Sequence, residues 1–396
     1  MKFLKSVRYF IKETDLMLLL TCVFTSAFGL LVVHSATLNR ISDGALISRD
    51  TKAMLIAVVL GIVACVFISA IDYEIIIHLW PIIAIFSLLL MGTLFIWGEG
   101  PAARPDVKTW LRFGSFYFQP SELLKVAFIV TFAMHADMLK DKINKPSSIL
   151  QLGIHALVPA GLVFITGDLG SALVFICIFG GIMFVSGVYI RYFFVVASFA
   201  VAAIPILWLN FFSEFQKQRF LAVYYPRGLT ESAYNAVIYQ QQQGISAIGS
   251  GGIKGSGLFN GVFTQNELVP ESKNDMIFTV VGEELGLLGG LALLAVLFFI
   301  VIKIVLVAKN TNDNVSRLLC YGSAFMIAGQ IVINIGVCLK LFPVIGITLP
   351  LVSSGGSSNL CVYLTIGIVL SVYRFNKERA PVNFRLSGIN TPFSDV

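Results

Sequence analysis

A polar, charged segment runs directly into a long apolar one at Val269-Pro270-Glu271-Ser272-Lys273-Asn274-Asp275-Met276-Ile277-Phe278, and the apolar stretch continues through Gly282-Glu283-Glu284-Leu285-Gly286. An acid, Asp275, stands where the two meet. Acidic side chains at a boundary between water and lipid cost free energy, and they mark functional sites more often than not. The junction therefore predicts a membrane helix that follows it and a functional role for Asp275.

Apolar residues dominate the chain. Of its 396 residues, 57% are hydrophobic and 13% are charged, whereas a typical soluble domain is about 25% charged. The sequence therefore predicts an all-α polytopic membrane protein, with one transmembrane domain over 1–396. About ten apolar runs approach the length that crosses a ~30 Å hydrocarbon core. They cover 16–36, 53–71, 75–97, 121–138, 152–166, 168–189, 192–212, 276–307, 317–339 and 354–374. The eighth, 276–307, is the longest and is expected to tilt or to project from the bilayer.

Basic residues are unevenly distributed between the two sides of the predicted membrane. With the N-terminus inside, most Lys and Arg side chains that flank the spans fall on the cytoplasmic side, as the positive-inside rule requires. This bias predicts that both termini are cytoplasmic and that the long polar segment 213–275 is a large extracellular loop. The first apolar run is expected to be a retained helix, since no small-residue cleavage site follows it.

The cysteines and histidines carry no metal or disulfide signature. All six cysteines lie inside apolar runs and none forms a C-x-x-C pair, and the four histidines show no H-E-x-x-H spacing. We therefore expect neither a disulfide framework nor a zinc site. The basic ends of the chain are expected to contact anionic lipid, and the sequence carries no signal for nucleic-acid binding.

Three charged residues fall inside or beside predicted spans. Glu122 and Lys125 open the fourth span and share a helix face, since they are three residues apart. Lys125 is unfavourably placed for the helix dipole, so it needs an anionic partner. That partner is Glu122, a ligand phosphate, or each of them in turn. Asp168 begins the sixth span, where aspartate is a preferred N-cap. Its alternative role is that of an acid facing a central cavity.

Asp275, like Asp168, has a structural and a functional interpretation. It either caps the eighth helix or takes part in chemistry. On a continuous helix it would lie in line with the small residues Thr279 and Gly282, and another helix or a lipid chain can approach such a face closely. The neighbouring acids Glu283 and Glu284 point elsewhere. We expect these two to be buried in ion pairs with basic residues.

Two further segments are rich in residues that interrupt regular structure. The glycine run 249–261 predicts tight turns or backbone N–H groups exposed to a ligand. The segment 342–358 contains Pro343 and Pro350 and precedes the tenth span. Irregular backbone at membrane depth is tolerated only where it is buried in protein or lines a cavity.

In their order along the chain, these motifs resemble those of the SEDS family (shape, elongation, division and sporulation). The matching segments are Phe118-Gln119-Pro120-Ser121-Glu122-x-x-Lys125, Asp168-Leu169-Gly170, the 249–261 run, Pro270-Glu271 with Asp275-x-Ile277-Phe278 and Glu283-Glu284-Leu285-Gly286, and Gly346-Ile347-Thr348-Leu349-Pro350 with Gly355-Gly356-Ser357-Ser358. The sequence departs from the family's usual Tyr at Ser354 and from its usual Thr at Asn274. No departure removes a carboxylate.

The resemblance implies a peptidoglycan glycosyltransferase of the bacterial plasma membrane that polymerises lipid II into β-1,4 glycan strands. It implies that Asp275 is the general base, which deprotonates the acceptor sugar's 4-hydroxyl so that this oxygen attacks the donor's anomeric carbon with inversion. Either basic side chains or a divalent cation, Mg²⁺ or Mn²⁺ with Asp275 as a ligand, would stabilise the leaving undecaprenyl diphosphate. The candidate substrate-binding residues are Glu122, Lys125, Asp168, Arg219, Lys254, Glu271 and Ser357.

Family members work with a class B penicillin-binding protein, a transpeptidase, and the resemblance implies that partner here. The short tails and Pro343-Val344 favour a RodA-like member over an FtsW-like one. Two other functions fit the membrane spans: a lipid II flippase, and a non-catalytic scaffold for a wall synthase. The enzyme is favoured because polar residues concentrate in one outer loop, whereas a transporter places its site near the bilayer midplane.

Overall fold

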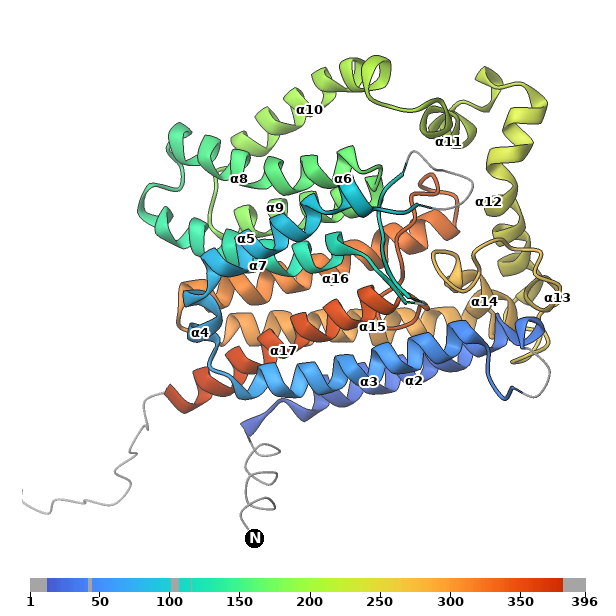
Figure 1. Ribbon diagram of the computed structural model, residues 1–396, viewed down its shortest axis with the longest axis horizontal. Helices are drawn as coiled ribbons and strands as arrows, with labels where there is room; N and C mark the ends of the chain where they lie inside the picture. Colours follow the sequence, from blue (N-terminus) through green and yellow to red (C-terminus); the bar gives the residue numbers. More distant parts are fainter. Residues whose placement is uncertain (1–12, 42–44, 101–106, 115, 380–396) are drawn as a thin grey trace, which may run out of the picture.

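The computed structural model describes residues 13–41, 45–100, 107–114 and 116–379 (Figure 1). Within these ranges the one sheet is an antiparallel hairpin of β1 (Leu111–Phe113) and β2 (Phe116–Phe118). The α-helices are α2 (Leu16–Ser35), α3 (Arg49–Ala70), α4 (Tyr73–His78), α5 (Trp80–Gly92), α6 (Leu94–Trp97), α7 (Pro120–Met138), α8 (Pro146–Ile165), α9 (Leu169–Val185), α10 (Ile190–Asn210), α11 (Glu214–Tyr224), α12 (Glu231–Gly251), α13 (Val262–Gln265), α14 (Ile277–Glu284), α15 (Gly286–Lys309), α16 (Asn314–Cys338) and α17 (Gly356–Arg379).

Eight helices in the described ranges are long and apolar enough to cross a membrane. They are α2, α3, α5 with α6, α8, α10, α15, α16 and α17. The fourth and sixth expected spans are also helical, but α7 carries three charged side chains and α9 has 17 residues. The prediction of an all-α polytopic membrane protein is confirmed.

Many helices begin where the sequence supplies a capping residue. The side chains of Asp15, Ser48, Asp168 and Asp313 accept backbone hydrogen bonds from the first turns of α2, α3, α9 and α16, as good N-caps do. Pro120 opens α7, where its missing N–H costs no helical hydrogen bond. Local sequence therefore determines several helix starts without help from packing.

Among the candidate membrane spans, α16 and α17 are the most buried, and they lie at the centre of the bundle in Figure 1. α16 packs against α7, α9, α15 and α17, and α17 runs along α3, where Gly61 makes room for the ring of Tyr363. α10 stands apart at the upper edge of the view, and none of its residues is buried. The bundle therefore has a well-packed centre and one weakly packed, apolar helix.

The irregular segment between α16 and α17 is buried in protein. Gly29 of α2 lies against the backbone of Leu351 and Val352, and Gly170 of α9 lies against the carbonyl group of Ile345. Side chains as large as Leu349 are almost completely covered. The structure thus confirms that this interrupted backbone is enclosed in protein, one of the two situations in which the sequence predicts irregular backbone.

The expectation of one long helix over 276–307 is wrong. The chain forms α14 and then α15, with a break at Leu285 and a positive φ of 66° at Gly286. The single span expected over 75–97 is likewise divided into α4, α5 and α6. At the first of these breaks, the backbone at 252–253 accepts hydrogen bonds from Leu287 and Leu288. A long-range contact thus replaces helical hydrogen bonds that sequence periodicity predicted.

The segment 213–275 is largely helical and contains α11, α12 and α13. Its glycine run packs on the α14–α15 break, where the N–H groups of Ser256 and Gly257 donate to the carbonyls of Glu283 and Glu284. A Cβ atom on Gly251 would collide with the carbonyl oxygen of Gly282. The glycines therefore serve close packing of backbone on backbone.

We predict that Gly251→Ala destabilises the protein by about 1–3 kcal/mol, the usual cost of overpacking, because the new methyl group meets the α14 backbone. The matched control is Gly249→Ala in the same helix, where a Cβ would meet nothing within 4 Å and helix propensity improves. Thermal unfolding in detergent measures both variants. Equal melting temperatures for the two would contradict the close approach of α12 to α14.

Candidate active site

Asp275 lies in the turn that precedes α14 and does not cap that helix, because the N-cap position belongs to Met276. Its side chain is buried, with 8% of the residue exposed. Gln240 of α12 donates to Asp275 Oδ1 at 3.4 Å, and Asn334 of α16 donates to the Asp275 backbone carbonyl at 2.8 Å. Two helices therefore hold this acid, and the capping interpretation is wrong.

The surroundings of Asp275 raise the pKa of its carboxyl group to about 7. Burial is the largest cause, since it penalises the charged form, and the nearby carboxylate of Glu271 raises the pKa further. The guanidinium group of Arg219 and the hydrogen bond from Gln240 oppose this rise. A carboxyl group with a pKa near neutrality can accept and release a proton at physiological pH, which suits a general base.

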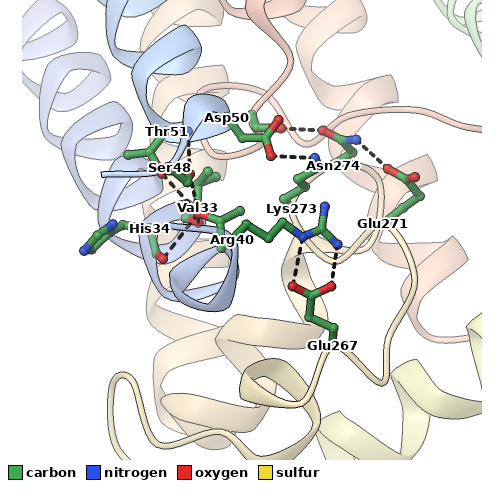
Figure 2. A network of polar contacts seen from close by, with 12 residues as sticks. Val33, His34, Arg40, Ser48, Asp50, Thr51, Glu267, Glu271, Lys273 and Asn274 are labelled. Atoms are coloured by element: carbon green, nitrogen blue, oxygen red, sulfur yellow. Dashed lines mark hydrogen bonds and ion pairs between the residues drawn. The ribbon is translucent and has the colours of Figure 1, made fainter. Parts of the chain in front are cut away.

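Two ion pairs join the segment before Asp275 to the residues that follow α2 and to the start of α3 (Figure 2). Arg40 forms hydrogen bonds of 3.0 and 2.9 Å with the two carboxylate oxygens of Glu267. Lys273 Nζ lies 2.6 Å from Asp50 Oδ2 at the start of α3. The turn that carries Asp275 is therefore tied to a second part of the bundle.

Asn274 links the same turn to the segment that precedes α17. Its Nδ2 atom donates to Glu271 at 2.6 Å, and Ser354 Oγ donates to its Oδ1 atom. The Ser353 hydroxyl donates to the Asn274 carbonyl at 2.6 Å. Asn274 and Ser354 both depart from the family's usual residues, and in this chain they form one hydrogen-bonded pair.

Asp168 caps α9 and also joins α9 to the start of α7. Its carboxylate accepts hydrogen bonds from the Ser171 backbone at 2.9 Å, from Gln119 at 2.7 Å and from Ser121 at 3.1 Å. Ser357, at the start of α17, accepts from the Gln119 backbone at 3.0 Å. The structure therefore brings Asp168 and Ser357 together around Gln119.

Glu122 and Lys125 form the ion pair that their spacing allows, with 2.7 Å between Oε1 and Nζ. Both side chains are buried, and that of Lys125 is 1% exposed. A buried charge needs such a partner, since an unpaired one costs several kcal/mol. Of the two partners that the sequence left open for Lys125, the structure supplies Glu122.

A pocket lies between α11, the start of α9 and the irregular segment. It is lined by Gly167, Leu169, Gln216, Arg219, Phe220, Pro343, Val344 and Ile345. Arg219 Nη1 donates to the Val344 carbonyl at 2.8 Å, and its guanidinium group lies 4.4 Å from the centre of the Phe215 ring. The pocket lining thus includes both sequence neighbours of Asp168 and also Arg219, whose charge lowers the pKa of Asp275.

The structure does not bring Lys254 into this site. Lys254 is exposed and lies in the glycine run that packs at the C-terminal end of α14. Asp275 precedes the N-terminal end of the same helix, whose eight residues span about 12 Å. Glu271, by contrast, lies in the Asp275 turn and affects the pKa of that acid.

The expected ion pairs of Glu283 and Glu284 are wrong. Both acids are buried, but in the described ranges their partners are neutral donors. Glu283 accepts from the backbone and hydroxyl of Thr264 at 2.9 and 2.7 Å, and Glu284 accepts from the Ser35 hydroxyl at 2.6 Å. Glu284 also accepts from Gln265 at 3.2 Å. Backbone N–H groups of α13 satisfy the Glu283 carboxylate, a contact between separate elements that sequence spacing cannot show.

Sequence reasoning missed two residues of the site, Gln240 and Asn334. Gln240 begins a run of four glutamines, and Asn334 is an amide inside the apolar run 317–339. A polar side chain inside a membrane span is itself a signal of function, so Asn334 could have been found. The described residues contain no group of three or more His, Cys, Asp or Glu side chains able to hold a metal ion.

The fold and site define a polytopic membrane protein with a buried carboxyl group of near-neutral pKa, on which an arginine that lines a pocket acts electrostatically. Residues 15–378 match the cell cycle protein family that comprises FtsW, RodA and SpoVE. The chain belongs to this family, and the resemblance to SEDS proteins is confirmed.

Relatives of two kinds are about equally similar to the chain. It is 31% identical over 368 residues to the probable peptidoglycan glycosyltransferase FtsW of Trichlorobacter lovleyi, which covers 91% of this chain and 93% of that one. It is 31% identical over 299 residues to the peptidoglycan glycosyltransferase MrdB of Escherichia coli, covering 75% and 78% respectively. The preference for a RodA-like member therefore stays a prediction.

Two solved structures share the fold. A chain from a structure described as the structural coordination of polymerization and crosslinking by a peptidoglycan synthase complex matches with a TM-score of 0.75 and 25% identity, covering 92% of this chain and 98% of that one. The rod shape determining protein RodA of Thermus thermophilus matches with a TM-score of 0.67 and 24% identity, covering 92% and 97%.

We predict that Glu122→Gln lowers the free energy of unfolding by about 3–5 kcal/mol, since it leaves the Lys125 charge buried without its partner. The double variant Glu122→Gln/Lys125→Met should recover much of this loss, because it removes the charge as well. The control is Glu214→Gln in the exposed pair with Lys217, where the Glu214 side chain is 80% exposed and the loss should stay below about 1 kcal/mol. Melting curves of the three variants test this prediction. A Glu122→Gln protein as stable as the wild type would contradict the buried pair.

Proposed function

We propose that this protein is a peptidoglycan glycosyltransferase that polymerises lipid II into β-1,4 glycan strands for cell-wall synthesis. Its relatives FtsW and MrdB are named peptidoglycan glycosyltransferases, and the chain belongs to their family. The observation that carries the chemistry is the buried carboxyl group of Asp275, whose pKa lies near 7.

Asp275 acts as the general base of one inverting displacement. Its carboxylate takes the proton from the acceptor's 4-hydroxyl, and the oxygen forms a bond to the anomeric carbon of the donor. The bond from that carbon to the diphosphate breaks, and its electron pair leaves with the undecaprenyl diphosphate. A single inversion converts the α-linked diphosphate into a β-1,4 linkage. The proton then leaves Asp275 for solvent, which a pKa near neutrality permits.

Arg219 is our candidate for stabilising the charge that develops on the leaving diphosphate. It lines the pocket next to Asp168 and acts electrostatically on Asp275, and a positioned cation at a developing charge is a strong catalytic device. Lys125 is engaged with Glu122, and Lys254 lies at the far end of α14. Asp168 and Ser357 would shape the opposite wall of the substrate site through Gln119.

A divalent cation, Mg²⁺ or Mn²⁺, is compatible with this site. Asp275 and Glu271 are two neighbouring carboxylates, and Mg²⁺ commonly binds through one or two carboxylates together with substrate phosphates. When bound, the ion would neutralise charge on the diphosphate. Arg219 and the two carboxylates would then share the binding of the substrate headgroup.

We place the 213–275 segment on the extracytoplasmic side of the bacterial plasma membrane, with both termini in the cytoplasm. The distribution of Lys and Arg supports this orientation. We also propose a class B penicillin-binding protein as partner, since a solved structure with the same fold comes from a peptidoglycan synthase complex that couples polymerization with crosslinking.

The structure supplies no observation that favours a lipid II flippase or a non-catalytic scaffold. A flippase would need an acid in the bundle that is open to its cargo, yet Asp168 and Glu122 are each engaged by neighbouring side chains. A scaffold would give no reason to bury the Asp275 carboxyl group beside the carboxylate of Glu271, an arrangement that raises its pKa and costs free energy.

We predict that Asp275→Asn lowers polymerisation of lipid II at least 100-fold, in line with the ~10²–10⁴-fold contribution of a general base. Purified protein is incubated with lipid II, with and without a class B penicillin-binding protein, and the glycan strands are separated on a gel. The control is Glu214→Gln, an exposed acid in α11, which should leave the ladder unchanged. A normal ladder of glycan strands from Asp275→Asn would contradict the role of Asp275 as the general base.

We predict that polymerisation rises about tenfold per pH unit below pH 7 and levels off above it, because only the deprotonated form of Asp275 is a base. An aspartate at its ordinary pKa of 3.8 would reach the plateau about three units lower. Glu271→Gln removes a negative neighbour that raises the pKa of Asp275, so its rising limb should move to lower pH. The initial rate of polymerisation is measured between pH 5 and 9 for the wild type and for Glu271→Gln. A flat wild-type profile would contradict the raised pKa of Asp275.

A further inference from the structure

A strained turn precedes the candidate base. Glu271 has a positive φ of 53°, in the left-handed region that residues other than glycine rarely adopt. The backbone N–H groups of Asn274 and Met276 both donate to the Glu271 carbonyl, so the chain folds back on itself around Asp275. A residue keeps such a conformation only where the surrounding structure holds it there. The position of Asp275 therefore depends on the contacts that hold this turn.

One set of contacts holds the backbone of the turn. The three successive carbonyl groups of residues 273–275 each accept a hydrogen bond. The donors are the Ser354 N–H group at 3.0 Å, the Ser353 hydroxyl at 2.6 Å and the Asn334 amide at 2.8 Å. Ser353 and Asn334 are buried, so water does not compete for their bonds. The turn is thus attached to α16 and to the segment before α17.

The second attachment is an ion pair between side chains (Figure 2). Lys273 Nζ lies 2.6 Å from Asp50 Oδ2, and the two side chains are 18% and 34% exposed. Lys273 stands two residues before Asp275 in the chain. The other ion pair of this region, Arg40 with Glu267, attaches the chain eight residues before Asp275. The contact between Lys273 and Asp50 is therefore the ion pair that acts close to the candidate base.

Asp50 stands on a firm support in the first turn of α3. The hydroxyl groups of Thr37, Ser48 and Thr51 are buried and hydrogen-bond to one another, with distances of 2.7, 3.2 and 2.9 Å. They join the residue that follows the end of α2 to the start of α3 (Figure 2). Asp50 is therefore fixed independently of the turn that it contacts.

We propose that Asp50 and Lys273 are a positioning pair: Asp50 holds the Lys273 side chain and thereby sets where the Asp275 carboxylate meets the acceptor hydroxyl. The inference rests on the proposed function, in which Asp275 is the base. Neither residue of the pair needs to touch the substrate. A partly exposed ion pair contributes little to stability, whereas moving a reacting group by about 1 Å can cost ~100-fold in rate. A positioning role therefore predicts a large loss of kcat with a small loss of stability.

The test measures lipid II polymerisation by the full-length variants Lys273→Met and Asp50→Asn and by the double variant. We expect kcat to fall at least about tenfold in each single variant, with KM for lipid II unchanged within about twofold. The double variant should lose no more than either single variant, because both substitutions break the same contact. The swapped variant Asp50→Lys/Lys273→Asp, which restores the ion pair with its charges exchanged, should recover most of the rate.

The two single variants change the local charge in opposite directions. Lys273→Met removes a positive charge and Asp50→Asn removes a negative one, so a purely electrostatic effect on the reaction would move the two rates in opposite directions. A Lys273 side chain that contacted the substrate would instead raise KM in Lys273→Met and leave Asp50→Asn active. Loss of kcat in both variants is the result that a displaced turn predicts.

The ion pair of Lys303 with Asp15 provides a matched control. Its Nζ to Oδ2 distance is also 2.6 Å, and the Lys303 side chain is 20% exposed. Asp15 caps the N-terminal end of α2, whose 20 residues span about 30 Å, whereas the turn lies near the residues after the other end. Asp15 is the more buried acid, so Lys303→Met should lower the melting temperature at least as much as Lys273→Met while keeping the wild-type kcat.

A kcat within about twofold of the wild type in either single variant would overturn the positioning role, and so would losses that multiply in the double variant. A swapped protein that melts as the wild type does but polymerises no faster than the single variants would also contradict it. If Asp275→Asn is inactive in these cases, the proposed function stands and this inference alone fails. If Asp275→Asn polymerises lipid II normally, the proposed base itself fails, whatever the pair variants do.

Discussion

Backbone carbonyl groups of the irregular segment between α16 and α17 accept hydrogen bonds from side chains on three different helices. The carbonyls lie within 342–347, and the donors are Gln241 of α12, Arg219 of α11 and Asn334 of α16. Carbonyl groups buried in protein have no water to pair with, so protein donors must satisfy them. Asn334 also donates to the backbone carbonyl of Asp275. The same side chain therefore satisfies a carbonyl of the irregular segment and helps to position the candidate base.

Charge burial is handled differently in the two polar parts of the site. Glu122 and Lys125 neutralise one another within a single helical turn, which removes most of the cost of placing them in the bundle. Asp275 is buried beside another acid, Glu271, and receives only partial compensation from Arg219. The first arrangement supports stability, whereas the second keeps a carboxyl group ready to exchange a proton. A stability cost at a site of chemistry is a common feature of enzymes.

Sequence patterns predicted the helices well where local chemistry determines them, as at the caps Asp168 and Asp313. They failed at 276–307, because the break before α15 depends on hydrogen bonds to the backbone at 252–253, which lies far away in sequence. They also failed for Glu283, whose partners are N–H and hydroxyl groups of α13. In both cases a contact between distant segments overrode the local pattern, and periodicity carries no information about such contacts.

The sequence by itself determined that this is a helical membrane protein with an acid at a polar junction, because hydropathy and the placement of charges are local properties. It also identified Asp275, Glu122 and Lys125. Only the tertiary structure decided that Asp275 is held by Gln240 and Asn334, that Lys254 lies elsewhere, and that the glycine run is a packing surface. Those outcomes depend on which helices meet, and the pKa of a carboxyl group depends on the burial and charges that this meeting creates.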